Sequence, residues 1–115
     1  MPIDVRPVSG NKELEVFLPL PWTLGVDREP NWVPPLLDDY RKQLDPKNSI
    51  FLEHGEIETW TAFKDGKPVG RISAQIDHDY DKTWPNEPKT AFFGFFECID
   101  DVEVAKALFA KAEEW

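Results

Sequence analysis

An alternation of apolar and polar residues on both sides of Asp65-Gly66 constrains the fold of this 115-residue chain more than any other feature. Residues 57–64 and 67–76 each repeat with a period of two, which is typical of strands. The Asp-Gly dipeptide tolerates the positive φ angles of a tight turn. The sequence therefore predicts an antiparallel hairpin over residues 57–76, with Asp65-Gly66 at its tip.

Two further strands are predicted outside the hairpin. Residues 90–98 are apolar on both faces, as in a strand that lies inside a sheet or against a partner. Gly94 within this segment indicates a bulge or a close approach of two backbones. We expect residues 67–76 to pair with it. Residues 3–8 alternate less clearly and contain a proline, which favours a short strand at the edge of the sheet.

Three segments have the apolar spacing of helices. They are residues 14–18, residues 34–44 with two prolines in the first turn, and residues 101–115, whose N-terminus is acidic. Residues 22–33 show no clear period and predict a packed connection, and residues 78–89 predict a long polar loop. Together these elements predict an α+β fold, in which an antiparallel sheet is flanked by helices.

Charge and composition exclude several classes of protein. Thirteen Lys and Arg residues stand against 22 Asp and Glu residues, which gives a formal net charge of −9. Such a chain repels phosphate backbones and anionic lipids, so we expect neither nucleic acid nor membrane as a partner. The single cysteine, Cys98, cannot form an intramolecular disulfide, and the first residues lack the pattern of a secretory signal. We therefore expect a cytoplasmic protein with one domain.

Several short segments resemble the GNAT superfamily of N-acetyltransferases, in particular a bacterial group of uncharacterised members. The order of the expected elements is that of the front half of the GNAT fold. The resembling motifs, spread over nearly the whole chain, are Val5-Arg6-Pro7-Val8, Leu20-Pro21-Trp22, Trp32-Val33-Pro34-Pro35-Leu36, Asp65-Gly66-Lys67-Pro68-Val69-Gly70-Arg71-Ile72 and Phe92-Phe93-Gly94-Phe95-Phe96-Glu97. The resemblance implies that residues 1–115 form a single incomplete GNAT-like domain, truncated after its N-terminal portion. It also implies that the full-length parent transfers an acyl group from acetyl-coenzyme A to an amine.

The resemblance also implies where the site residues lie. Glu97, at the end of the fourth strand, is placed where a carboxylate can deprotonate an amine. Phe96 and Cys98 on the same strand would present backbone groups to the pantetheine arm of the cofactor. Ala105 matches the last position of the turn whose amides cradle the pyrophosphate in this superfamily.

The pyrophosphate turn departs from the family's pattern at two positions. Asp100 stands where Arg or Gln is expected, and Glu103 stands where the first Gly is expected. Together with Asp101 they place three acidic groups beside a doubly charged pyrophosphate, and each close contact between like charges costs about 1 kcal/mol in water. We therefore expect no cofactor and no activity in this chain alone, and acetyl-coenzyme A only in the full-length parent.

Two other functions compete with acyl transfer. The acidic turn favours a non-catalytic binding or assembly domain that has kept the sheet and lost the cofactor chemistry. A small-molecule carrier or a cystatin-like fold is the third hypothesis. Because strand 90–98 would have no fifth strand beside it, we expect a homodimer through this strand, through helix 101–115 or through both, with Phe93 or Phe95 near the contact.

Metal-binding patterns in the sequence are incomplete. Asp77, Asp79 and Asp81 alternate as in a calcium loop, but the glycine and the final glutamate that such a loop requires are missing. His54 and His78 have no second His or Cys at the spacing of a zinc site. We therefore predict no metal site.

Overall fold

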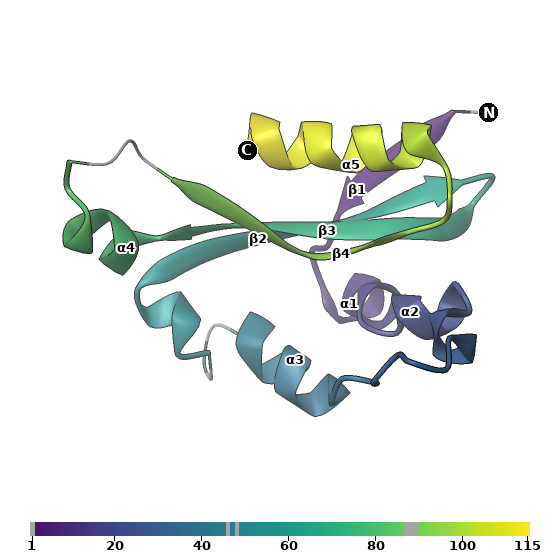
Figure 1. The fold of residues 1–115 in the computed structure, drawn as a ribbon, viewed down its shortest axis with the longest axis horizontal. Coiled ribbons are helices and arrows are strands. Elements are labelled where there is room, and N and C mark those ends of the chain that lie inside the picture. The colour runs from purple at the N-terminus through teal and green to yellow at the C-terminus, as the bar shows by residue number, and fades with distance from the viewer. Residues whose placement is uncertain (1, 46, 48, 87–89) are drawn as a thin grey trace.

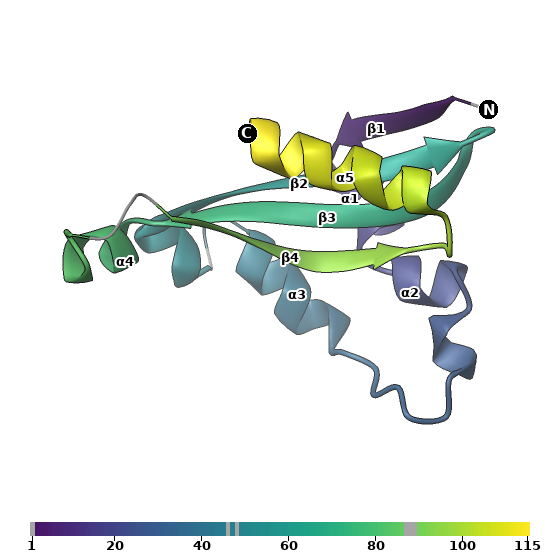
Figure 2. The same cartoon turned by 45° about the horizontal axis from the view of Figure 1, so that its top comes forward.

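A four-stranded antiparallel sheet organises the molecule. The structure, a computed structural model, describes residues 2–45, 47, 49–86 and 90–115. The strands follow each other in chain order as β1 (Ile3–Pro7), β2 (Gly55–Lys64), β3 (Lys67–Asp77) and β4 (Ala91–Cys98). Figure 2 shows β1 and β4 at opposite edges of this sheet. The helices are α1 (Asn11–Phe17), α2 (Leu20–Thr23), α3 (Leu37–Leu44), α4 (His78–Thr83) and α5 (Val102–Glu114). The predicted α+β class is confirmed.

Helices cover both faces of the sheet. In Figure 1, α5 lies across one face, and α1, α2 and α3 lie on the other. Between β3 and α5 the side chains of Ile72, Val104 and Leu108 are fully buried, and on the opposite face Phe17 and Leu18 at the end of α1 are fully buried. Burial of apolar area on both faces is therefore what holds the helices to the sheet. None of the helices within the described ranges combines the length and apolar character needed to cross a membrane.

The predicted hairpin is confirmed. Lys64 pairs with Lys67 across the turn, and both turn residues have positive φ angles, 54° at Asp65 and 77° at Gly66. Strand β3 also pairs with β4, as expected, with Ile76 opposite Ala91. The first strand ends at Pro7, one residue earlier than predicted, although the amide of Val8 still donates to the carbonyl of Thr59 at 2.9 Å.

The predicted irregularity in β4 is present one residue beyond Gly94. The register between β3 and β4 shifts between Arg71 and Ser73, and Phe95 adopts a φ angle of 52°. Gly94 itself is tightly packed, because an added Cβ would lie 3.2 Å from the Ser73 side chain. The bulge therefore turns the backbone at a phenylalanine, where positive φ is unfavourable without support from the surroundings.

Helical segments lie in two stretches where the sequence predicts irregular chain. Helix α4 lies within the polar loop predicted over residues 78–89. The Asp77 carboxylate caps this helix, because it accepts hydrogen bonds from the amides of Asp79 and Tyr80 at 3.0 and 3.3 Å. Residues 87–89 of that loop lie outside the described residues. Helix α2 occupies the start of the predicted connection 22–33. Helix α3 begins at Leu37, so the two prolines precede its first turn.

Candidate functional site

A row of four polar residues crosses all strands of the sheet. Arg6 on β1 lies opposite Thr61 on β2, Thr61 lies opposite Arg71 on β3, and Arg71 lies opposite Glu97 on β4. Residues opposite each other in register share a face of the sheet. For this row it is the face that carries the end of α1, because Arg71 bonds to Phe17 there. Thr61 and Arg71, in the middle of the row, are buried.

The guanidinium of Arg71 joins α1 to the bulge in β4. Its Nη1 donates to the carbonyls of Phe17 and Leu18 at 2.8 and 3.1 Å, and its Nε donates to the carbonyl of Phe95 at 2.9 Å. Burial lowers the pKa of Arg71, and the negative charge of Glu97 acts in the opposite direction. Arg71 therefore satisfies carbonyls that a helix end and a bulge would otherwise leave without donors.

Aromatic side chains hold the bulge from the same side. The ring of Phe95 lies 5.6 Å from that of Phe17 and 4.8 Å from that of Tyr40 on α3, measured between centroids. The guanidinium of Arg71 also lies over the Phe95 ring, at 5.5 Å from its centroid. Residues of α1, α3 and β3 thus contact Phe95, the non-glycine residue of β4 with a positive φ angle.

The structure separates the predicted site residues of β4 between two faces. Glu97 is half-buried on the face of the polar row, two residues beyond the bulge. Phe96 instead packs on Phe109 of α5, with ring centroids 4.7 Å apart. Cys98 packs into the core beside Gly70, and burial, together with nearby carboxylates, raises the pKa of its thiol. A raised pKa favours the protonated thiol, so the surroundings of Cys98 do not activate its sulfur.

The turn before α5 does not fit a pyrophosphate. The Asp101 side chain accepts the amide proton of Glu103 at 2.9 Å, and its backbone carbonyl accepts those of Val104 and Ala105 at 3.1 and 3.2 Å. Lys64 donates to the same carboxylate at 3.0 Å, which lowers the pKa of Asp101. The amide of Ala105, which the resemblance assigns to the cofactor, is therefore already bonded within the helix.

One cluster on the described part of the chain has the donors of a metal site. His54 Nδ1 lies 3.0 Å from Asp77 Oδ1 and 3.7 Å from Asp79 Oδ2, so folding brings together residues that the spacing in sequence keeps apart. The same contacts also have a structural explanation. Although desolvation acts to raise it, the pKa of Asp77 is lowered because the amides of α4 and the ring of His54 donate to it. The contacts of Asp77 in this cluster are therefore explained by its role as the N-cap of α4.

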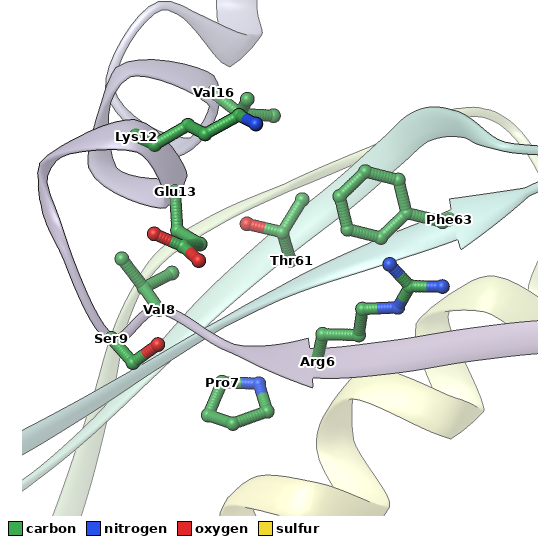
Figure 3. Close-up of a pocket in the computed structure, with 9 residues that line it drawn as sticks. All are labelled: Arg6, Pro7, Val8, Ser9, Lys12, Glu13, Val16, Thr61 and Phe63. Atoms are coloured by element: carbon green, nitrogen blue, oxygen red, sulfur yellow. The ribbon is translucent and has the colours of Figure 1, made fainter.

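A pocket of about 490 Å³ lies at the edge of the sheet, between β1, β2 and the first turns of α1. Figure 3 shows Thr61 inside it, with its hydroxyl oxygen turned toward the α1 side, and Phe63 and Arg6 beside it. The side chain of Thr61 is buried, and within the described ranges its Oγ1 is the buried side-chain atom without a hydrogen-bond partner. Nothing in the sequence signals this pocket, because Thr61 is there only one polar position in an alternating strand. The full lining is Arg6, Pro7, Val8, Ser9, Lys12, Glu13, Val16, Thr61 and Phe63.

Two curated bacterial proteins are similar to this chain over nearly its whole length. The bacterial ceramide synthase of Caulobacter vibrioides (strain NA1000 / CB15N) is 38% identical over 114 residues, which make up 98% of this chain and 29% of that protein. Protein YghO of Escherichia coli (strain K12) is 38% identical over 111 residues, which make up 96% of this chain and 27% of that protein. The chain thus spans less than a third of the length of these relatives. No family model and no solved structure gives a match.

Proposed function

We propose that this chain is the N-terminal part of a GNAT-like N-acyltransferase, and that the whole protein transfers an acyl group from a thioester to an amine. The observation that carries the proposal is the bulge in β4 at Phe95, whose positive φ turns the backbone of the strand that the resemblance assigns to the thioester arm. Arg71 and Tyr40 hold this bulge in place. A strained position with this much support is typical of a functional site.

In this proposal Glu97 is the general base. A carboxylate on the bulge face accepts a proton from the ammonium or amine of the acceptor, and the nitrogen attacks the thioester carbonyl. The C–N bond forms, the C–S bond breaks, and the sulfur leaves as a thiol after taking up a proton. Because the turn before α5 offers no free amide at Ala105, the pyrophosphate of a coenzyme A donor is not assigned to it.

The name of one relative supports an amine as acceptor. A ceramide is the amide of a fatty acid and a long-chain amino alcohol, so a ceramide synthase forms an amide bond. The chain is 38% identical to that protein over a stretch that makes up 29% of the protein's length. We therefore propose a long-chain amine as the acceptor of the whole protein.

A chimera tests this function. The matched stretch of the Caulobacter relative is replaced by this chain, and the formation of amide from a fatty acyl thioester and a long-chain amino alcohol is followed by mass spectrometry. We expect the chimera to form the amide, and Glu97→Gln to reduce kcat by about a hundredfold. Glu113→Gln, an exposed change on α5, is the matched control. A folded chimera without activity, or full activity of Glu97→Gln, would contradict the proposal.

A non-catalytic binding or assembly domain is the second candidate. It is favoured by the partnered amides and acidic side chains before α5, and by the exposure of Phe93 on the edge strand β4. In this case the chain would use the sheet edge for association instead of catalysis, and Glu97→Gln would change nothing.

A further inference from the structure

We propose that the pocket between β1, β2 and α1 binds a monocarboxylate that carries an apolar chain. The first observation is Thr61, which is 3% exposed and whose hydroxyl has no partner among the described residues. A buried hydroxyl without a partner costs about 1–3 kcal/mol, so native proteins rarely retain one without a reason. Thr61 lines the pocket and its hydroxyl oxygen is turned toward α1 (Figure 3), so a ligand that displaces the side chains over this oxygen can accept its proton.

Two cations line the pocket together with the hydroxyl of Ser9 and the carboxylate of Glu13. Arg6 donates through Nε to Asp4 at 2.6 Å and lies over the Phe63 ring at 5.2 Å, which leaves its terminal nitrogens for a ligand. Lys12 lines the pocket as the second cation. The positive charges of Arg6 and Lys12 in the lining favour an anionic oxygen on a ligand.

The charge of Glu13 limits the ligand to a single negative charge. Its carboxylate lies over Gly10 at the start of α1, where an added Cβ on Gly10 would be 3.2 Å from Glu13 Oε2. A negative charge is favourable in the first turn of a helix, so this carboxylate already has a structural role there. It also lines the pocket and repels a second negative charge on the ligand. A carboxylate therefore fits better than a dianionic phosphate.

Apolar side chains line much of the pocket, and they favour a ligand that carries an apolar chain. Val8, Val16 and Phe63 line the pocket around the Thr61 hydroxyl. The volume of about 490 Å³ is within the range of small-molecule sites in proteins. An alkyl chain on the carboxylate would cover these side chains and gain the free energy of burying them. This inference does not rest on acyl transfer, because the pocket and Glu97 lie at opposite ends of the polar row.

Titration of the chain with a set of eight-carbon probes tests the proposal. Octanoate, octan-1-ol, octylamine and octyl phosphate share one tail and differ in the head, and binding is measured by calorimetry and by amide chemical shifts. We expect octanoate to bind at least about tenfold more tightly than the other three, with shifts at Thr61 and Lys12. Equal binding of octan-1-ol, tighter binding of octylamine or of octyl phosphate, or no binding of octanoate in the millimolar range would overturn it.

Variants then assign the contacts. Thr61→Val should weaken octanoate binding about tenfold, whereas Thr61→Ser, which keeps the hydroxyl, should restore most of it. Lys12→Met should weaken binding several-fold, whereas Lys106→Met on α5 should not. Glu13→Gln should tighten it, because the repelling charge is removed. If Thr61→Val or Lys12→Met binds octanoate as the unchanged chain does, or if Glu13→Gln weakens binding, the proposed contacts are wrong.

Discussion

The Nε atom of Arg71 donates a 2.9 Å hydrogen bond to the backbone carbonyl of Phe95, the residue whose φ angle is 52°. The same guanidinium binds the carbonyls of Phe17 and Leu18 at the end of α1. A strained backbone persists only where its surroundings determine it. The buried guanidinium of Arg71 therefore links the strained residue of β4 to the end of α1.

Replacing Arg71 by Met should therefore destabilise the chain strongly. The carbonyls of Phe17, Leu18 and Phe95 would remain buried without this donor, and we expect a loss of about 3 kcal/mol or more in the free energy of unfolding. Urea denaturation measures it. Arg41→Met is the control, because its ion pairs with Glu15 and Asp38 are on the surface and should contribute no more than about 1 kcal/mol. Equal effects of the two substitutions would show that Arg71 does not hold the bulge.

Thr61→Val should stabilise the chain in the absence of ligand. Valine has nearly the shape of threonine, and the change removes a buried hydroxyl that has no partner among the described residues. We expect a gain of about 1 kcal/mol in the free energy of unfolding, measured by urea or thermal denaturation. Thr23→Val, which removes an exposed hydroxyl bonded to the Pro19 carbonyl at 3.4 Å, should give no gain. A loss of stability in Thr61→Val would mean that the hydroxyl finds a partner in solution.

The ion pair between Lys64 and Asp101 should appear in the pH dependence of stability. The hydrogen bond from Lys64 and that from the Glu103 amide lower the pKa of Asp101 in the folded chain. The contribution of this ion pair to the free energy of unfolding is therefore present above the pKa of Asp101 in the unfolded chain, near about 4. It is lost as the pH falls through the lower pKa of Asp101 in the folded chain. Asp101→Asn should lower stability at pH 7 and differ less from the unchanged chain below pH 4. Asp100→Asn, at an exposed position, should leave the acid profile unchanged.

Much of the fold could be predicted because its determinants are local. The hairpin depends on Asp65-Gly66 and on a period of two, both of which are visible in a short stretch of sequence. Helix α4 was missed although its signal is also local, since Asp77 caps it directly. The candidate sites could not be predicted in the same way. That Arg71 lies opposite Glu97, or that the Thr61 hydroxyl lacks a partner, depends on the register of strands and on the packing of α1, which no local pattern encodes.

The chain alone should bind acetyl-coenzyme A weakly or not at all. The amides of Glu103, Val104 and Ala105 already donate to Asp101, and Asp100 adds a further negative charge beside the turn. We expect no dissociation constant tighter than about 1 mM in titration calorimetry. Binding in the low micromolar range would mean that the turn opens for the pyrophosphate. Asp101→Asn removes one charge and keeps an acceptor for the amide of Glu103, whereas Asp101→Ala removes the charge and also frees that amide, so the two variants together separate the charge from the blocked amide.

The exposed phenylalanines of β4 lead to the last prediction, that the chain self-associates. Strand β4 is an edge of the sheet in the described part of the chain, and its Phe92 and Phe93 are 42% and 59% exposed. Burying two phenylalanines per chain contributes at most about 3–6 kcal/mol before the costs of association, which favours a dimer but does not by itself set its affinity. The net charge of −9 opposes association, but salt screens this repulsion within about 10 Å.

Phe93 is the residue through which to test the dimer. Phe95, the other residue expected near the contact, packs its ring against Phe17 and Tyr40, so its substitution would report on folding as much as on association. We expect light scattering to give a dimer mass for the unchanged chain and a monomer mass for Phe93→Lys in the same salt. Val33→Lys is the control, because Val33 is 81% exposed and lies outside the sheet. A monomer mass of the unchanged chain across the micromolar range would exclude association through this edge.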